Sequence, residues 1–241
     1  MTDAPRAPQE PHAPAVPAEQ VLAAALAVLA HRAGPLPAVT VTWARSATGA
    51  IAAADGRPLA LSAAQSMTLT HQLRAAHDAI LVGIATVIAD DPLLSVRLLP
   101  GLPPQPQPVV LDSRLRFPLH ARLLARTDRK PWIFFSAEPG PPRAALEQRG
   151  ARLFRAAAGP GGVDLYDVLR MLGDQGIRSV MVEGGARVLR AFLAAGFADQ
   201  VIVTTSPSTA QGLNGPDLPA FVKTLSVQVG PDAVTWGIPN P

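Results

Sequence analysis

A carboxylate and two glycines stand where an apolar segment gives way to a helix-like one, and this turn is suited to binding a ligand. Glu183, Gly184 and Gly185 follow the run SVMV and precede the segment ARVLRAFL. A carboxylate at the end of a buried strand needs a partner, which a ligand N–H or hydroxyl group or a neighbouring arginine can supply. Glycines let backbone amides approach a ligand, and free amides at a helix start favour phosphate. Purely steric needs also place glycines in such turns.

A second turn of this kind lies within residues 71–97. The apolar run Ala79–Val82 is long enough for a buried strand but short for a helix, and polar residues follow it. These residues are Gly83, Thr86, Asp90 and Asp91. We expect a strand that leads into a ligand-binding loop, because ligands of open α/β sheets bind beyond the carboxyl ends of strands.

The adjacent carboxylates Asp90 and Asp91 could be read as paired catalytic acids or as part of a metal site. Neighbouring side chains on an extended chain point apart, however, and Pro92 favours that extended form at Asp91. We therefore reject a two-carboxylate glycosidase. The chain has no cysteine, and its five histidines show no HxxxH spacing, so we expect no protein metal site.

A third group of polar residues ends the apolar segment PVVL. Asp112, Ser113 and Arg114 follow it directly. A serine and an arginine at a strand end suit the additional phosphate of a cofactor, whereas a turn-forming Asp–Ser pair with an exposed arginine is the alternative. The chain contains no GxGxxG, GxxxxGK[ST] or GxSxG motif, which argues against a standard Rossmann dehydrogenase, a P-loop enzyme and an α/β-hydrolase.

Composition indicates a soluble globular protein of 241 residues, with 48% hydrophobic and 16% charged residues. No apolar stretch reaches the ~18 residues that a membrane span requires. The net charge of +3 arises from interleaved charges without a polybasic run, so we expect no nucleic-acid partner. Arginines directed at phosphorylated small molecules explain this small excess as well as an arginine-rich solvated surface does. We expect a cytoplasmic protein.

The first 36 residues are expected to form an Ala/Pro-rich arm and a short helix, ahead of one domain over residues 37–241. Residues 1–17 have the composition of a disordered arm. A short amphipathic helix is expected over Ala18–Arg32, ended by Gly34 and Pro35. A signal peptide is the competing interpretation, but acidic rather than basic residues precede this apolar stretch.

Strand-like and helix-like segments then alternate, which predicts a mainly parallel sheet with helices on both faces. Strands are expected at 39–44, 79–83, 108–113, 132–136, 179–182 and 200–206, and helices at 63–76, 142–149, 165–175 and 186–195. We expect Ser62 and Asp164 to cap two of these helices. The tail from Val222 to Gly237 should add antiparallel strands around the turn at Gly230.

From about Val39 to Gly237, the chain resembles the pyrimidine reductases of riboflavin biosynthesis, which have a dihydrofolate-reductase-like fold. The resemblance rests on motifs that occur in the family's order and span most of the domain. They are AxSxxG at 44–49, HxLRAxxDAILVGxxTVxxDDPxLxVR at 71–97, PVVLDSxLRxP at 108–118, VEGGxxxLxxFLxxGxxD from residue 183, and GPD at 230–232. The motif at 71–97 is the most specific of these.

The resemblance implies an NADPH-dependent oxidoreductase, homodimeric like its relatives, that reduces a ribosylaminopyrimidine 5′-phosphate to the ribitylamino product. It places at the cofactor the positions Ala44, Thr86, Asp90, Ser113, Gly185, Ala186, Arg187 and Val188. The residue types at the same turns add Arg114 and Gly184 to these expected cofactor contacts. It places at the substrate the positions Arg74, Leu94, Arg97 and Glu183. Two arginines suit a phosphate and a glutamate suits pyrimidine or ribityl donors, whereas no proton donor is assigned.

The chain departs from the family at two motif positions. Thr48 stands where an aspartate is usual, and Ala85 where a glycine is common. Two alternatives therefore accompany the reductase hypothesis: an enzyme of the same fold that acts on a dihydrofolate-like pterin, and a catalytically silent NADPH-binding protein. Loss of a charge at Thr48 is the main support for the silent protein, whereas Arg74, Arg97 and Glu183 favour the phosphorylated pyrimidine.

Overall fold

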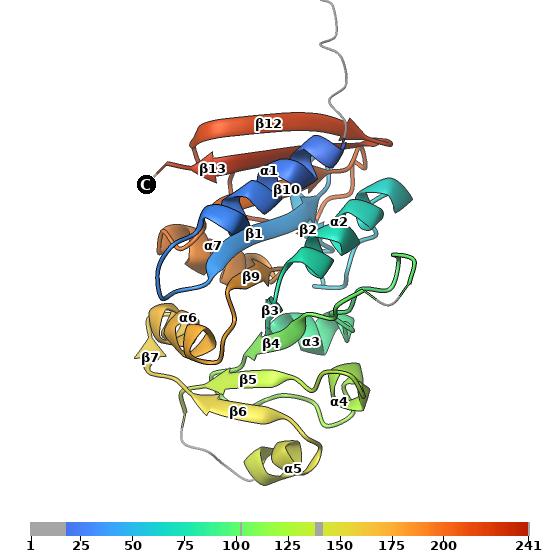
Figure 1. Ribbon diagram of the computed structural model, residues 1–241. Helices are drawn as coiled ribbons and strands as arrows, with labels where there is room; N and C mark the ends of the chain where they lie inside the picture. The colour runs from blue at the N-terminus through green and yellow to red at the C-terminus, as the bar shows by residue number, and fades with distance from the viewer. Residues whose placement is uncertain (1–17, 102, 138–141, 241) are drawn as a thin grey trace, which may run out of the picture.

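The structure is a computed structural model that describes residues 18–101, 103–137 and 142–240. The arm predicted over residues 1–17 lies outside the described residues. A nine-stranded sheet crosses the molecule in the order β12, β13, β10, β1, β9, β3, β4, β5, β6 (Figure 1). Its strands are β1 Ala38–Arg45, β3 Ala79–Gly83, β4 Gln107–Leu111, β5 Trp132–Phe135, β6 Arg152–Arg155, β9 Ser179–Val182, β10 Gln200–Thr205, β12 Phe221–Val229 and β13 Asp232–Pro239.

The sheet is parallel from β10 through β6, and β12 and β13 add an antiparallel hairpin at one edge. This arrangement confirms the predicted mainly parallel sheet with antiparallel C-terminal strands. Two short ribbons lie apart from the sheet. They pair β2 Ala50–Ala52 with β11 Leu213–Asn214, and β7 Ala158–Gly159 with β8 Gly162–Val163.

Helices cover both faces of the sheet, as the alternating pattern predicts. They are α1 Ala18–His31, α2 Ala64–Ala76, α3 Ile84–Asp90, α4 Arg122–Ala125, α5 Pro142–Gln148, α6 Leu165–Asp174 and α7 Ala186–Ala194. Alternate residues of β3 serve the two faces, because successive strand side chains point to opposite sides. Leu81 packs with residues of α6 and α7, whereas Ile80 and Val82 pack with residues of α3, α4 and α5. No helix among the described residues has the length and hydrophobicity to cross a membrane.

Helix α1, predicted from the N-terminal extension, packs into the fold. Val21 and Ala25 are fully buried and belong to an apolar cluster with Trp236 of β13. The Gln200 side-chain amide donates to the Ala25 carbonyl oxygen at 3.3 Å, which ties the helix to β10. Figure 1 shows α1 lying beside α2 on one face of the sheet, over the part that contains β10 and β1. The helix is therefore part of the core on this face.

Several local predictions were wrong. The segment after β3 is helix α3 rather than a loop, and Asp91, its C-cap, is left-handed with φ 40° rather than extended. The Asp91 carboxylate accepts from the Arg122 amide at 2.8 Å, which supports this conformation. Ser62 does not cap α2, whose N-cap is Ala63, whereas Asp164 caps α6 by accepting from the Asp167 amide. Strand β6 was not predicted.

Two histidines of the α2 region are buried. His77 bridges the Leu73 carbonyl oxygen and the Thr40 hydroxyl group, each at 2.7 Å. His71 is 0% exposed, and its Nδ1 accepts from the Arg97 amide at 3.0 Å. Burial, together with the positive charges of Arg74 and Arg97, lowers the pKa of His71 from 6.5 to about 4. Burial also lowers the pKa of His77.

We predict that the free energy of unfolding falls as the pH is lowered from 6.5 toward 4. In this range the unfolded chain protonates its histidines while folded His71 remains neutral, so the unfolded state binds more protons. A difference of one proton gives a slope of about 1.4 kcal/mol per pH unit. Urea unfolding at several pH values measures the slope, and His71→Asn should reduce it. An equal slope in both proteins would contradict the prediction.

Candidate active site

The parallel strands bring the predicted site residues to one edge of the sheet. In the strand register, Leu81 of β3 pairs with Val182 of β9, and Gly83 pairs with Leu111 of β4. The turn after β9 therefore lies beside the turn after β3, and Ser113 follows β4 at the same edge. Three segments far apart in the sequence thus converge.

The two glycine-bearing turns are in direct contact. The Gly185 amide donates to Thr86 Oγ1 at 3.1 Å, and the Glu183 amide donates to the Leu81 carbonyl oxygen at 2.9 Å. Thr86 lies on α3 and Gly185 is the N-cap of α7. Helix α3 and the start of α7 therefore form adjoining walls of one cavity of about 550 Å³, which we call the inner cavity.

The inner cavity gathers most of the predicted positions. It is lined by Ala44, Arg74, Thr86, Asp90, Glu183, Gly184, Gly185, Ala186 and Arg187, together with apolar residues that include Trp43, Leu59 and Met67. Desolvation raises the pKa of the Asp90 carboxyl group. The inner cavity is thus mainly apolar, with two carboxyl groups and two arginines on its wall.

Arg74 and Glu183 form a bidentate ion pair at this wall. Arg74 Nε donates to Glu183 Oε1 at 2.7 Å and Nη2 to Oε2 at 2.6 Å, with the side chains only 11% and 14% exposed. Burial alone would lower the pKa of Arg74, but its attraction to Glu183 outweighs burial and the pKa is raised. Arg74 Nη1 also donates to the Ser95 carbonyl oxygen at 3.2 Å. Of the two partners expected for Glu183, a ligand group or a neighbouring arginine, the structure shows the arginine.

Two of the glycines are required by packing. A Cβ atom on Gly83 would lie 2.7 Å from Val188 Cγ2, and one on Gly184 would lie 2.6 Å from Val188 Cβ. These glycines let α7 approach the ends of β3 and β9. A Cβ atom on Gly185 would meet only Thr86 Oγ1, at 3.5 Å. Steric need thus explains Gly83 and Gly184, while Gly185 lies where the turn opens on the inner cavity.

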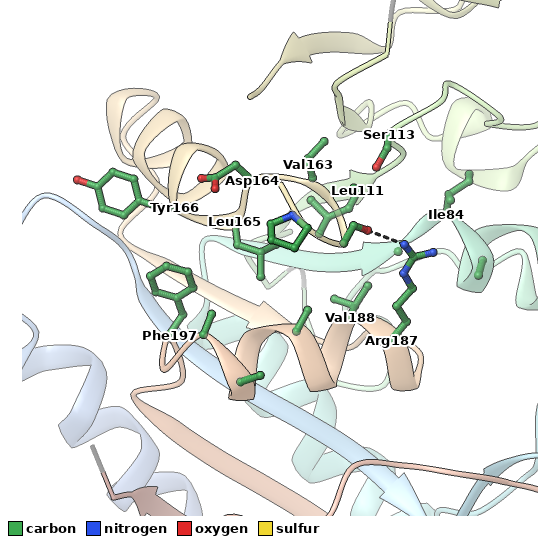
Figure 2. Close-up of a pocket in the computed structure, with 18 of the residues that line it drawn as sticks. Ile84, Leu111, Ser113, Val163, Asp164, Leu165, Tyr166, Arg187, Val188 and Phe197 are labelled. Carbon is green, nitrogen blue, oxygen red and sulfur yellow. Dashed lines mark hydrogen bonds between the residues drawn. The ribbon is translucent and has the colours of Figure 1, made fainter. Parts of the chain in front are cut away.

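A second cavity, of about 890 Å³, extends from the inner cavity along α7, and we call it the outer cavity (Figure 2). Gly83, Ala85 and Arg187 line both cavities. Arg187 Nη2 donates to the Gly161 carbonyl oxygen at 2.7 Å, the bond drawn in Figure 2. The remaining predicted cofactor positions Ser113, Arg114 and Val188 line the outer cavity, with Arg116, Asp164, Tyr166 and Phe197. The two cavities therefore adjoin at Gly83, Ala85 and Arg187, and we call the pair of cavities the cleft.

Groups suited to phosphate are present in the outer cavity. Arg114 and Arg116 are exposed, and neither guanidinium pairs with another of the described residues. At the junction, Gly185 gives α7 no side-chain cap, so the first amides of this helix are available to an anion. Arginine side chains and a helix start together provide donors at two points along the cleft.

The predicted substrate positions Leu94 and Arg97 are not among the residues that line either cavity. The Leu94 side chain is 3% exposed and packs in an apolar cluster, while its carbonyl oxygen accepts from Arg126 Nη1 at 2.8 Å. Arg97 is exposed, and within the described residues its guanidinium has no hydrogen-bonding partner. Burial lowers the pKa of Arg97, and repulsion by Arg74 and Arg122 lowers it further, whereas Glu183 raises it. Arg97 thus belongs to a group of positive charges beside the inner cavity.

Thr48 has a structural role. Its hydroxyl oxygen lies 2.5 Å from the Ala210 carbonyl oxygen and 2.8 Å from Ser46 Oγ, which itself lies 2.8 Å from that carbonyl oxygen. The two hydroxyl hydrogens are shared among these three contacts. Thr48 lines neither cavity. The threonine therefore links the turn after β1 to residues that follow β10.

Some of the cleft residues escaped sequence analysis. Arg116 and Tyr166 line the outer cavity, and Trp43 lines the inner one. Gly161, whose carbonyl oxygen accepts from Arg187, belongs to a glycine-rich segment at 159–162 that the sequence analysis does not assign to a site. Its three glycines were a usable signal, because such segments often lie against ligands. Within the described residues, no group of three side chains is placed to hold a metal ion.

Known proteins share this sequence pattern and fold. Residues 37–220 match the family model described as the RibD C-terminal domain. The chain is 37% identical over 177 residues to the 2,5-diamino-6-ribosylamino-4(3H)-pyrimidinone 5′-phosphate reductase of Methanothermobacter thermautotrophicus, covering 73% of this chain and 80% of that protein. It is 34% identical over 183 residues to the riboflavin biosynthesis protein RibD of Aquifex aeolicus, covering 76% of this chain but only 50% of that protein.

Solved structures agree with these relationships. Acinetobacter baumannii RibD superposes with a TM-score of 0.73 at 27% identity, over 86% of this chain and 59% of that one. Dihydrofolate reductase from Enterococcus faecalis, at 16% identity and a TM-score of 0.50, covers 84% of this chain and 97% of that one and shows the fold alone. The predicted dihydrofolate-reductase-like fold is thus confirmed. With its converging turns and its sequence matched over residues 37–220, the chain belongs to the RibD C-terminal domain family.

Proposed function

We propose that this chain catalyses the NADPH-dependent reduction of a ribosylaminopyrimidine 5′-phosphate to the ribitylamino product in riboflavin biosynthesis, acting as a cytoplasmic homodimer. The bond between Gly185 and Thr86 carries the proposal, because it joins two predicted ligand turns into one cleft. The name of the Methanothermobacter relative describes this reaction for the diamino form of the substrate. The proposal covers the substrate class and leaves the base open to either form.

The cleft fits an elongated dinucleotide. The outer cavity offers unpaired Arg114 and Arg116 beside Ser113, as a 2′-phosphate on the adenosine ribose requires. The uncapped start of α7 suits the pyrophosphate, and the inner cavity suits the nicotinamide. When bound, the cofactor supplies the hydride. The chain's own residues orient the two reactants and exclude water.

The substrate end of the cleft is organised by charge. Glu183 accepts two hydrogen bonds from Arg74, and its carboxylate oxygens retain lone pairs that can accept from pyrimidine or ribityl donors. Arg74 is already committed to Glu183 and to the Ser95 carbonyl oxygen, so the main phosphate contact falls to Arg97. Arg122 adds positive charge next to Arg97. The sequence predicts that Arg74 and Arg97 both bind the phosphate. In this proposal Arg97 binds it, and Arg74 and Arg122 contribute only their positive charge.

The reaction needs alignment more than chemistry from the protein. In the ring-opened form of the substrate, C1′ is doubly bonded to the exocyclic nitrogen. Addition of a hydride to C1′ and of a proton to nitrogen yields the ribitylamine. The apolar lining that includes Trp43 and Leu59 keeps the imine from water, while Glu183 fixes the pyrimidine end. Because Thr48 lies outside both cavities, the structure offers no support for the silent homologue.

We predict that Arg114→Ala lowers kcat/KM with NADPH by about tenfold or more and leaves kcat/KM with NADH unchanged. A charge-assisted bond to the 2′-phosphate contributes about 1.5–3 kcal/mol, and NADH lacks that phosphate. Loss of absorbance at 340 nm with each cofactor measures the effect. Arg129→Ala, at an exposed arginine outside both cavities, is the matched control. Equal losses with the two cofactors would show that Arg114 does not contact the 2′-phosphate.

We predict that Arg97→Ala raises KM for the phosphorylated pyrimidine about 10- to 150-fold, which corresponds to a charged hydrogen bond of about 1.5–3 kcal/mol. The KM for NADPH should stay unchanged, because Arg97 lines neither cavity. Steady-state kinetics with the phosphorylated substrate and with its dephosphorylated counterpart separate the loss of the phosphate contact from any other effect of the substitution on substrate binding. If the variant discriminates between these substrates as strongly as wild type does, Arg97 is not the phosphate ligand.

A further inference from the structure

His71 lies next to the charges at the substrate end and is not in contact with either cavity. It projects from α2 one turn before Arg74 and is 0% exposed. Its Nδ1 atom accepts from the Arg97 amide at 3.0 Å. The imidazole therefore connects α2 directly to the backbone of the proposed phosphate ligand.

The hydrogen-bonding pattern fixes the tautomer of His71. Because Nδ1 accepts from the Arg97 amide, the proton of the neutral ring is on Nε2. Within the described residues, Nε2 is buried without a partner. An unpaired buried donor costs free energy that an apolar side chain of similar size would avoid. Packing alone thus does not explain a histidine here, whereas the bond to Arg97 does.

The surrounding charges keep this acceptor available. Arg74 and Arg97 disfavour a positive charge on His71, burial disfavours it more strongly, and Glu183 opposes them only in part. His71 is consequently neutral at physiological pH. A protonated ring would carry hydrogens on both nitrogens and could not accept from Arg97.

The chain just before Arg97 is held by other residues. Arg74 donates to the Ser95 carbonyl oxygen, and the Gln105 side chain bonds both the amide and the carbonyl oxygen of Val96, each at 2.9 Å. The bond to His71 adds the next point along the chain, at Arg97 itself. The backbone is therefore fixed up to the residue whose guanidinium is free.

We infer that His71 is a positioning residue for the substrate phosphate: its Nδ1 atom fixes the Arg97 backbone so that the Arg97 guanidinium is held ready for the phosphate. The inference rests on the proposed function, because that function supplies the phosphate. The role of His71 differs from that of Arg97, because Arg97 contacts the phosphate and His71 acts only by holding Arg97.

His71→Leu and His71→Asn separate positioning from packing. Leucine removes the acceptor, whereas the asparagine Oδ1 atom can accept close to where Nδ1 does. His71→Leu should raise KM for the phosphorylated pyrimidine about five- to tenfold, the effect of one hydrogen bond, and leave kcat and the KM for NADPH unchanged. His71→Asn should restore most of the loss. His77→Asn is the matched control, since it removes a buried histidine that bonds Leu73 and Thr40 instead; thermal melting reports folding of each variant.

A double-mutant cycle and a binding probe complete the test. In an Arg97→Ala background, His71→Leu should have no further effect on KM, because its effect passes through Arg97. Calorimetric titration with ribose 5-phosphate reports on the phosphate site without turnover and should show weaker binding to His71→Leu.

The outcomes distinguish this inference from the proposed function. Wild type that binds ribose 5-phosphate more tightly than His71→Leu, yet does not reduce the pyrimidine, would sustain the inference and overturn the proposed function. Equal affinities in the two proteins, full additivity with Arg97→Ala, or no recovery in His71→Asn would overturn the inference.

Discussion

One hydrogen bond, from the Gly185 amide to the Thr86 hydroxyl group, joins the segments on which the cleft depends. The two residues are 99 positions apart in sequence, and only the parallel pairing of β3 with β9 brings them together. The same strand pairing continues one residue further, where the Glu183 amide donates to the Leu81 carbonyl oxygen. This bond fixes the backbone that carries the Glu183 carboxylate relative to β3. Sheet register thus determines the geometry of the site.

Close approach of α7 to the sheet is the second constraint. Val188 occupies the space that side chains at Gly83 and Gly184 would fill, so a glycine at the end of β3 and one in the turn after β9 both make room for this valine. This packing places the uncapped start of α7 at the junction of the inner and outer cavities. In the sequence Gly83 and Gly184 resemble ligand contacts. In the structure they act indirectly, because they let α7 approach the sheet and so position the first amides of this helix at the cleft.

Sequence patterns predicted the sheet and most helices because apolar periodicity reflects burial directly. They failed at α3, where a seven-residue helix follows a strand without a break, and at Asp91, whose left-handed conformation depends on the distant Arg122 amide. Most positions that the motifs named line the inner cavity, yet the motifs could not show that Arg74 is bound to Glu183. Such pairing depends on side-chain geometry between segments, which no local pattern contains.

The ion pair between Arg74 and Glu183 explains why the two arginines beside the inner cavity, Arg74 and Arg97, differ in their availability to an anion. A buried pair of this kind gains little net stability, but loss of one partner would leave an uncompensated buried charge, at a cost of about 3–5 kcal/mol. Arg74 therefore cannot leave Glu183 to follow a mobile phosphate. Its positive charge still adds to the field of Arg97 and Arg122. Of the two predicted substrate arginines, Arg97 is the one whose guanidinium has no hydrogen-bonding partner within the described residues. In the proposed function, the rigid Arg74–Glu183 pair is therefore suited to orienting the base, and Arg97 is suited to binding the phosphate.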